Sequence, residues 1–135
     1  MNRIAITGGI GSGKSYVSAL LEARGIPIYN ADNESKRLTV SDEKILNGLI
    51  ALLGEEVYQG NMLNKTLLAS YLFASSENAA KVNAIIHPCV KADFLRWVDE
   101  HHYCDIVGLE SAILYESGFD DVVDGVLMVY APESL

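Results

Sequence analysis

Gly8-Gly-Ile-Gly-Ser-Gly-Lys-Ser15 fits the pattern G-x-x-x-x-G-K-[ST] at every fixed position. Its glycines permit backbone angles that are closed to other residues, and they leave room for phosphate oxygens close to the chain. Successive backbone N–H groups can then point inward, and a helix that follows the loop offers its positive N-terminal end. The segment therefore predicts a phosphate-binding loop.

The residue types of this loop predict separate tasks. Lys14 is expected to neutralise the β and γ phosphates of a nucleoside triphosphate, and the Ser15 hydroxyl to enter the shell of Mg²⁺. The residues predicted to bind the phosphates of ATP are Gly9, Gly11, Ser12, Gly13, Lys14, Ser15 and Tyr16. The alternative is a glycine-rich turn without a ligand. GTPases, ATPases and small-molecule kinases all use such a loop, so the loop alone names no reaction.

The segments on either side of the loop predict a parallel sheet. Strands are expected at residues 3–7, 26–29, 106–109 and 126–130. Residues 15–24 carry apolar side chains at helical spacing, and Gly25 is a suitable helix stop. Strand, glycine loop, helix and strand begin a βαβ unit, which predicts an α/β fold of the P-loop NTPase type with helices flanking a parallel sheet.

The middle of the chain has a mostly helical pattern. Helices are expected at residues 31–38, 42–53 and 65–73, followed by two between residues 77 and 102 that are divided near Pro88. Residues 57–61 predict a turn. We therefore expect residues 1–135 to form a single domain, with a largely helical insertion at about residues 31–104. Because little chain follows the last strand, we expect this fold to be incomplete.

Composition and charge argue against several classes of protein. Hydrophobic residues make up 50% of the chain and charged residues 21%, an ordinary globular balance. The formal charge of −8 argues against a nucleic-acid surface, which needs clustered Lys and Arg. No apolar run approaches the roughly 20 residues of a membrane-spanning helix. The two cysteines and the lack of a signal-peptide pattern predict a cytoplasmic protein with reduced thiols.

The two signs of charge are unevenly distributed. All ten basic residues lie at or before Arg96, whereas the stretch from Trp97 to Leu135 carries nine acidic residues. One interpretation is an acidic, solvated face. The other is that a basic segment normally follows and is absent here.

Two carboxylates follow predicted strands, at positions where the carboxyl ends of parallel strands open on one crevice. Asp32 comes after the second strand and is a candidate to accept a proton from an attacking hydroxyl or to hold the water shell of the metal. Its alternative role is a helix N-cap. Glu110 closes the third strand, where an acid near Mg²⁺ is expected. Its alternative is an exposed acid at a strand end.

Several segments together resemble the dephospho-coenzyme A kinases, in the expected order and over essentially the whole chain. They are Ile4-Ala-Ile-Thr-Gly-Gly-Ile-Gly-Ser-Gly-Lys-Ser15, Gly25-Ile26, Ala31-Asp32, Asn64-Lys-Thr-Leu-Leu-Ala69, Asn83-Ala-Ile-Ile-His-Pro88 and Ile113-Leu-Tyr-Glu-Ser-Gly118. The Thr-Gly-Gly-Ile-Gly-Ser-Gly-Lys form of the loop is more specific than the general pattern. The resemblance implies phosphorylation of the ribose 3′-hydroxyl of dephospho-CoA by MgATP, the last step of coenzyme A synthesis.

The same resemblance implies roles for residues outside the loop. Asp32 becomes the candidate general base or hydroxyl-orienting group. Lys65 and His87 fall in the helical region on the substrate side, although His87 has the alternative role of a hydrogen-bonded structural histidine. Glu110 falls where many members carry an acid, which makes it a candidate for Mg²⁺ through water.

The chain also departs from the pattern of this family. Asn30 stands where many members have an additional aspartate, Lys65 replaces a frequent arginine, and Ser111-Ala112 stand where a proline is usual. The family continues into an arginine-bearing lid, a strand and a final helix, so we expect a C-terminally truncated member whose own activity is open. The incomplete sheet predicts self-association.

Two other functions remain open at this point. One is another small-molecule or nucleotide P-loop kinase, and the other is a nucleotide-binding fragment without turnover. A GTPase is disfavoured, because the guanine-specificity pattern Asn-Lys-x-Asp does not occur; Asn64-Lys65 continues with Thr66-Leu67.

Overall fold

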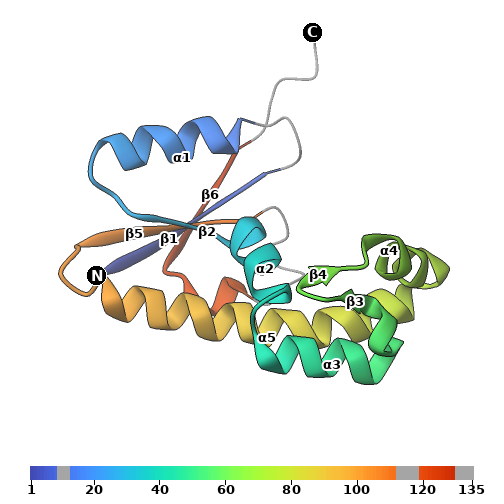
Figure 1. The fold of residues 1–135 in the computed structure, drawn as a ribbon. Helices are drawn as coiled ribbons and strands as arrows, with labels where there is room; N and C mark the ends of the chain where they lie inside the picture. The colour runs from blue at the N-terminus through green and yellow to red at the C-terminus, as the bar shows by residue number, and fades with distance from the viewer. Residues whose placement is uncertain (9–12, 112–118, 130–135) are drawn as a thin grey trace, which may run out of the picture. The chain divides into compact units, whose positions relative to one another are not determined.

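A computed structural model of the chain describes residues 1–8, 13–111 and 119–129. The chain divides into two compact units (Figure 1). The first comprises Met1–Asn33 and Asp93–Leu135, and the second comprises Glu34–Ala92. Each unit is described separately below.

The first unit is built on a four-stranded parallel sheet with the strand order β2-β5-β1-β6. Its strands are β1 (Asn2–Thr7), β2 (Ile28–Asn30), β5 (Ile106–Glu110) and β6 (Gly125–Met128). The expected parallel sheet is confirmed. The second strand begins two residues later than expected, after Pro27, which cannot donate a hydrogen bond to a ladder.

The register of the sheet aligns the carboxyl ends of its strands. Ile6 of β1 and Asn30 of β2 both lie opposite Glu110, on either side of β5, and Thr7 lies opposite Met128 of β6. Since β1 leads directly into the glycine loop, the loop begins at the edge of the sheet where Asn30 and Glu110 end their strands. The topology therefore gathers the candidate residues of this unit at one edge.

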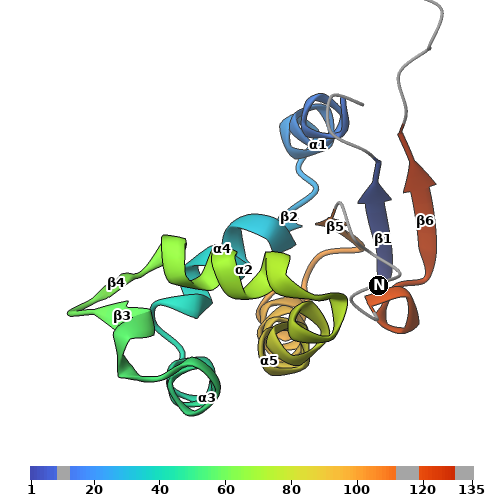
Figure 2. The ribbon, with the colours of Figure 1, turned by 90° about the vertical axis from the view of Figure 1, so that its right-hand side faces the viewer.

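Helices cover both faces of this sheet (Figures 1 and 2). The helix α1 (Lys14–Ala23) lies on one face, and residues 93–100 of α5 (Ser76–Glu100) lie on the other. A short 3-10 helix, η2 (Phe119–Val122), precedes β6. The expected stop after α1 is confirmed: Gly25 has φ of 87°, and the N–H of Ile26 donates to the carbonyl of Leu21 at 3.1 Å.

The core of the first unit follows the two-residue alternation of its strands. Val107 and Leu109 of β5 are fully buried, and Tyr29 of β2 packs edge-to-face against Phe94 of α5, with ring centroids 5.3 Å apart. Gly108 points to the opposite face, where an added Cβ would lie 2.4 Å from Cδ1 of Ile28. That close approach explains the glycine in the middle of a buried strand.

The second unit is mostly helical. It contains most of α2 (Ala31–Thr39), α3 (Glu43–Leu53), η1 (Glu55–Val57), the hairpin β3 (Tyr58–Gln59) and β4 (Met62–Leu63), α4 (Lys65–Ala74) and α5 up to Ala92. Asp42 and Asn64 cap α3 and α4 by accepting backbone N–H groups. The expected turn at residues 57–61 is part of a small antiparallel hairpin, whose Gly60 has φ of 66°.

The expected division near Pro88 is wrong, because α5 runs without interruption from Ser76 to Glu100. A proline removes one hydrogen bond of a helix but leaves the side-chain stripe intact. That stripe continues on both sides of Pro88 at a spacing of four residues, and its buried members are Val82, Ile86, Val90, Phe94 and Val98. Within the described parts of the chain, no helix is long and apolar enough to cross a membrane.

Candidate nucleotide site at the carboxyl edge of the sheet

The described part of the phosphate loop consists of its two ends. Gly9, Gly11 and Ser12 lie outside the described residues. Gly13 is the N-cap of α1 with φ of 93°, and its carbonyl accepts the first helical hydrogen bond from Val17 at 3.1 Å. A non-glycine residue would be strained at this φ, which explains the glycine immediately before the lysine.

The first turn of α1 carries the side chains that the motif predicts to meet phosphate. Lys14 is half-buried, whereas Ser15 and Tyr16 are exposed. This turn contains no acidic residue, so the positive end of the helix dipole is not offset from within the helix. The start of α1 is thus suited to an anion.

Glu110 is the buried polar centre of this edge. It is 4% exposed at the end of β5, so it is not the exposed strand-end acid of the alternative interpretation. Oε1 accepts the hydroxyl of Ser18 at 2.5 Å, and Oε2 accepts Nδ2 of Asn30 at 2.8 Å. Hydrogen bonds to an ionised carboxylate are shorter and stronger than neutral ones. Glu110 therefore joins α1 to the end of β2.

The oxygen donors at this edge fit Mg²⁺ in the way that nucleotide enzymes hold it. Mg²⁺ takes hard oxygen ligands, usually one or two from the protein with the rest from phosphates and water. The Ser15 hydroxyl is exposed, and each carboxylate oxygen of Glu110 retains acceptor capacity beside its one donor. In the described portions of the chain, no three His, Cys, Asp or Glu side chains form a metal-binding group. Ser15 and Glu110 thus offer oxygen donors of the type that Mg²⁺ takes.

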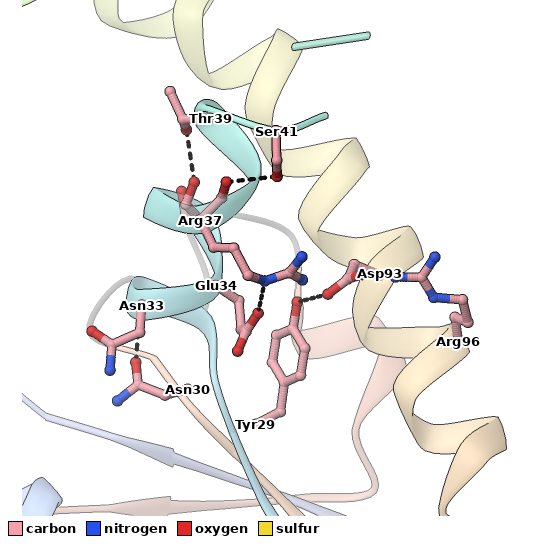
Figure 3. A network of polar contacts seen from close by, with 10 residues as sticks. Tyr29, Asn30, Asn33, Glu34, Arg37, Thr39, Ser41, Asp93 and Arg96 are labelled. Carbon is pink, nitrogen blue, oxygen red and sulfur yellow. Dashed lines mark hydrogen bonds and ion pairs between the residues drawn. The ribbon is translucent and has the colours of Figure 1, made fainter. Parts of the chain in front are cut away.

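Asp32 is the second residue of α2. It is not the N-cap, because the N–H of Asn33 donates to Oδ1 of Asn30 at 3.1 Å, and Asn30 immediately precedes the helix (Figure 3). Asp32 is partly exposed, and no hydrogen bond or ion pair between described residues engages its side chain. Its carboxylate is therefore available as an acceptor.

Lys65 and His87 belong to the second unit. Lys65 is exposed at the first position of α4, directly after the capping Asn64. His87 is half-buried in α5, and burial lowers the pKa of its imidazole below the usual value. The neutral ring, able to donate from one nitrogen and accept at the other, is thereby favoured near neutral pH.

Reasoning from the sequence missed two members of the polar centre. Ser18 lies inside α1, one helical turn after Lys14, where a serine is easily taken for a neutral helix residue. Asn30 is noticed in the sequence only as a departure from a family pattern. The β2–β5 register identifies Asn30, and the packing of α1 identifies Ser18. Each donates to Glu110, which is 92 residues away from Ser18 and 80 away from Asn30.

A family model described as dephospho-CoA kinase matches residues 2–135. The chain belongs to the dephospho-CoA kinase family. It is 58% identical over 133 residues to the dephospho-CoA kinase of Bacteroides fragilis (strain YCH46), covering 98% of this chain and 65% of that protein. It is 43% identical to the dephospho-CoA kinase of Porphyromonas gingivalis (strain W83), covering all of this chain and 66% of the relative. The chain thus spans about two thirds of the length of these kinases.

Two solved structures share the fold of this chain. The crystal structure of TT1252 from Thermus thermophilus superposes with a TM-score of 0.76 at 33% sequence identity, over 97% of this chain and 66% of that one. A dephospho-CoA kinase from Campylobacter jejuni also gives a TM-score of 0.76, at 18% identity, and shows the same fold.

Proposed function

We propose that this protein transfers the γ-phosphoryl group of ATP to the ribose 3′-hydroxyl of dephospho-CoA, giving ADP and coenzyme A. The observation that carries this proposal is the family match over residues 2–135. The described geometry agrees with it, because a helix N-terminus bearing Lys14 and Ser15 and a buried acid, Glu110, belong to the same unit. In the reaction, a bond forms between the 3′-oxygen and the γ-phosphorus, while the bond from that phosphorus to the β–γ bridging oxygen breaks.

The phosphate loop holds the nucleotide in this proposal. The backbone N–H groups of Gly9, Gly11, Ser12 and Gly13, with those of the first turn of α1, donate to phosphate oxygens. The ammonium group of Lys14 offsets the charge of the β and γ phosphates. Tyr16 is the last of the residues that we propose to bind the phosphates of ATP. Preorganised donors of this kind stabilise charge that develops on the transferring group without reorganising during the reaction.

Asp32 is proposed to orient the attacking hydroxyl and to accept its proton as the bond to phosphorus forms. Its place in the first turn of α2 and the lack of a described partner for its carboxylate support this role. In phosphoryl transfer the protein acts mainly through positioning and electrostatics, so a correctly placed acceptor is valuable even where proton transfer is late.

Mg²⁺ is proposed as the second cofactor, and when bound it supplies charge neutralisation at the β and γ phosphates. The Ser15 hydroxyl would be its protein ligand, and Glu110 would accept a hydrogen bond from one of its waters. On the substrate side, we propose that Lys65 attracts an anionic group of dephospho-CoA and that His87 offers the neutral imidazole favoured by its lowered pKa.

Two further expectations belong to the same proposal. A cytoplasmic location accords with two free cysteines, Cys89 and Cys104. Self-association would use β6, which ends the described sheet and exposes Val126, Leu127 and Met128. Light scattering tests the second point, and a monodisperse monomer at high concentration would contradict it.

The test follows coenzyme A formation from MgATP and dephospho-CoA, with three variants beside the wild type. Lys14→Ala should abolish both turnover and ATP binding. Asp32→Asn should retain ATP binding and lose about 10²-fold or more in kcat, the usual contribution of a general base. Lys81→Ala is the matched control, because it removes a positive charge from an exposed position of α5. Transfer to a nucleoside monophosphate but not to dephospho-CoA would refute the proposed substrate.

A further inference from the structure

Asn30 occupies an unusual position, at the junction of a strand and a helix. It is the last residue of β2 and immediately precedes α2. Its side chain uses both ends of the amide: Nδ2 donates to Oε2 of Glu110 at 2.8 Å, and Oδ1 accepts the N–H of Asn33 at 3.1 Å. The first bond crosses to the neighbouring strand, and the second caps the helix that carries Asp32.

The chemistry of these two neighbours specifies an amide at position 30. A buried carboxylate requires a donor, whereas a helix N-cap requires an acceptor. Asparagine supplies both, in a single orientation of its side chain. An aspartate would still cap Asn33, but its second oxygen would face Oε2 of Glu110 without a proton between them. Alanine would lose both bonds.

The contacts of Asn30 extend further through Glu110. The other carboxylate oxygen of Glu110 accepts the hydroxyl of Ser18, which is 4% exposed on the inner side of α1. Four groups are therefore connected in series: the Ser18 hydroxyl, the Glu110 carboxylate, the Asn30 amide and the Asn33 N–H. One end of this series is in the helix that begins with Lys14, and the other is in the first turn of α2.

We propose that Asn30 is a positioning residue of this site, which fixes the first turn of α2, and with it Asp32, to the end of β5 and to the phosphate-loop helix. Asn30 acts through Glu110 and Asn33 and does not itself touch the substrate. The kinetic consequence rests on the proposed function, because it assumes that Asp32 orients the acceptor hydroxyl. The structural consequence, a coupling between Asn30 and Glu110, stands independently of that assumption.

The decisive variants are Asn30→Ala, Asn30→Asp, Glu110→Gln and the double variant Asn30→Asp/Glu110→Gln. The double variant restores a carboxylate–amide pair with the two groups exchanged, and it retains an acceptor for the N–H of Asn33. Asn33→Asp is the charge control, because it adds one negative charge in the same turn from an exposed side chain. Steady-state kinetics, ATP-binding stoichiometry, thermal unfolding and exchange of the Asn33 amide proton are measured for each.

Asn30→Ala should lower kcat at least tenfold, because small misplacements of a reacting group cost one to two orders of magnitude. The KM for ATP should stay within about twofold, since the phosphate loop is untouched, and this split separates positioning from a general loss of folded protein. The Asn33 amide should exchange at least tenfold faster. Asn30→Asp should also lower kcat, and adding Glu110→Gln should bring it back to the level of Glu110→Gln alone.

Wild-type kcat in Asn30→Ala would overturn the inference, as would a loss of kcat that merely follows a loss of ATP-binding sites. A double variant whose shift in melting temperature is the sum of the single shifts would also overturn it, because Asn30 and Glu110 would then be uncoupled. If the wild type forms no coenzyme A, the proposed function fails, and the unfolding cycle with the Asn33 exchange rate still decides the positioning role.

Discussion

Removing a single hydroxyl from the buried face of the sheet tests how that face supports the site. Oη of Tyr29 donates to Oδ2 of Asp93 at 2.7 Å, and the second carboxylate oxygen of Asp93 is paired with Arg96 (Figure 3). Tyr29 is 2% exposed and Asp93 8% exposed. Tyr29→Phe removes the donor and leaves the ring in place against Phe94.

The loss of stability in Tyr29→Phe depends on Arg96, which remains paired with Asp93. A hydrogen bond to a charged group contributes roughly 1.5–3 kcal/mol to stability. Because Arg96 still pairs with Asp93 in the variant, the cost should lie at the lower end, at about 1.5 kcal/mol. For a chain of this size, one kcal/mol lowers the melting temperature by about 3–5 °C. Tyr29→Phe should therefore lower it by about 6 °C.

Thermal and urea unfolding, followed by far-UV and near-UV circular dichroism, measure this change. The midpoint in urea should fall without a change in the slope, because the surface exposed on unfolding is the same. Tyr103→Phe is the matched control: its side chain is 73% exposed, and its loss should cost less than about 0.5 kcal/mol. ATP affinity should not change, because the Tyr29 side chain lies on the face of the sheet that α5 covers. The neighbouring residue Asn30 points to the opposite face, where it donates to Glu110 of the candidate site.

Two outcomes would refute this reasoning. A melting temperature within about 1 °C of the wild type would mean that the hydrogen bond from Tyr29 to Asp93 contributes no more stability than the hydrogen bonds with water that it replaces. An equal loss in Tyr103→Phe would mean that the effect does not depend on the buried carboxylate.

Two further predictions concern the second unit. Gly48→Ala should destabilise the protein by about 1 kcal/mol, because an added Cβ would lie 2.8 Å from Cγ2 of Ile85, and this strain outweighs the better helix propensity of alanine. Ile85→Ala should relieve the strain, so the double variant should lose less stability in urea unfolding than the sum of the two single variants. Additive losses would mean that the contact with Ile85 is not the cause. Since burial lowers the pKa of His87, the unfolded state binds its proton more readily, and stability should fall as pH drops below about 6.5. His87→Gln should flatten this dependence between pH 7.5 and 5.5, and an unchanged slope would exclude His87 as its source.

The part of the fold that the sequence predicts best is the segment whose constraints are local. Gly13 and Gly25 both have a positive φ; Gly13 immediately precedes α1, and Gly25 follows its last residue, Ala23, by two positions. A helix cap, a glycine stop and an apolar period are all encoded within a few residues of the place where they act. The parallel sheet follows from the same local signals, because a strand–loop–helix–strand order leaves few arrangements.

The errors arose where a distant contact outweighs a local preference. Pro88 is a local signal to end a helix, yet α5 continues because its buried stripe runs from Val82 to Val98. A lost hydrogen bond costs about as much as a single buried apolar side chain contributes, so several such side chains outweigh one proline. The hairpin at Tyr58–Gln59 and Met62–Leu63 is too short for its alternation to be read from the sequence.

The site residues also differ in whether local sequence or distant contacts identify them. A motif predicts Lys14 and Ser15, because the loop that binds phosphate is contiguous. Asn30 and Ser18 are recognised as part of the site only from their hydrogen bonds to Glu110. The β2–β5 register brings the side chain of Asn30 to this carboxylate, and the packing of α1 brings that of Ser18. A buried acid needs donors wherever the fold can provide them. Asparagine at position 30 meets this need and also caps α2, so one side chain serves both the buried carboxylate and the start of the helix.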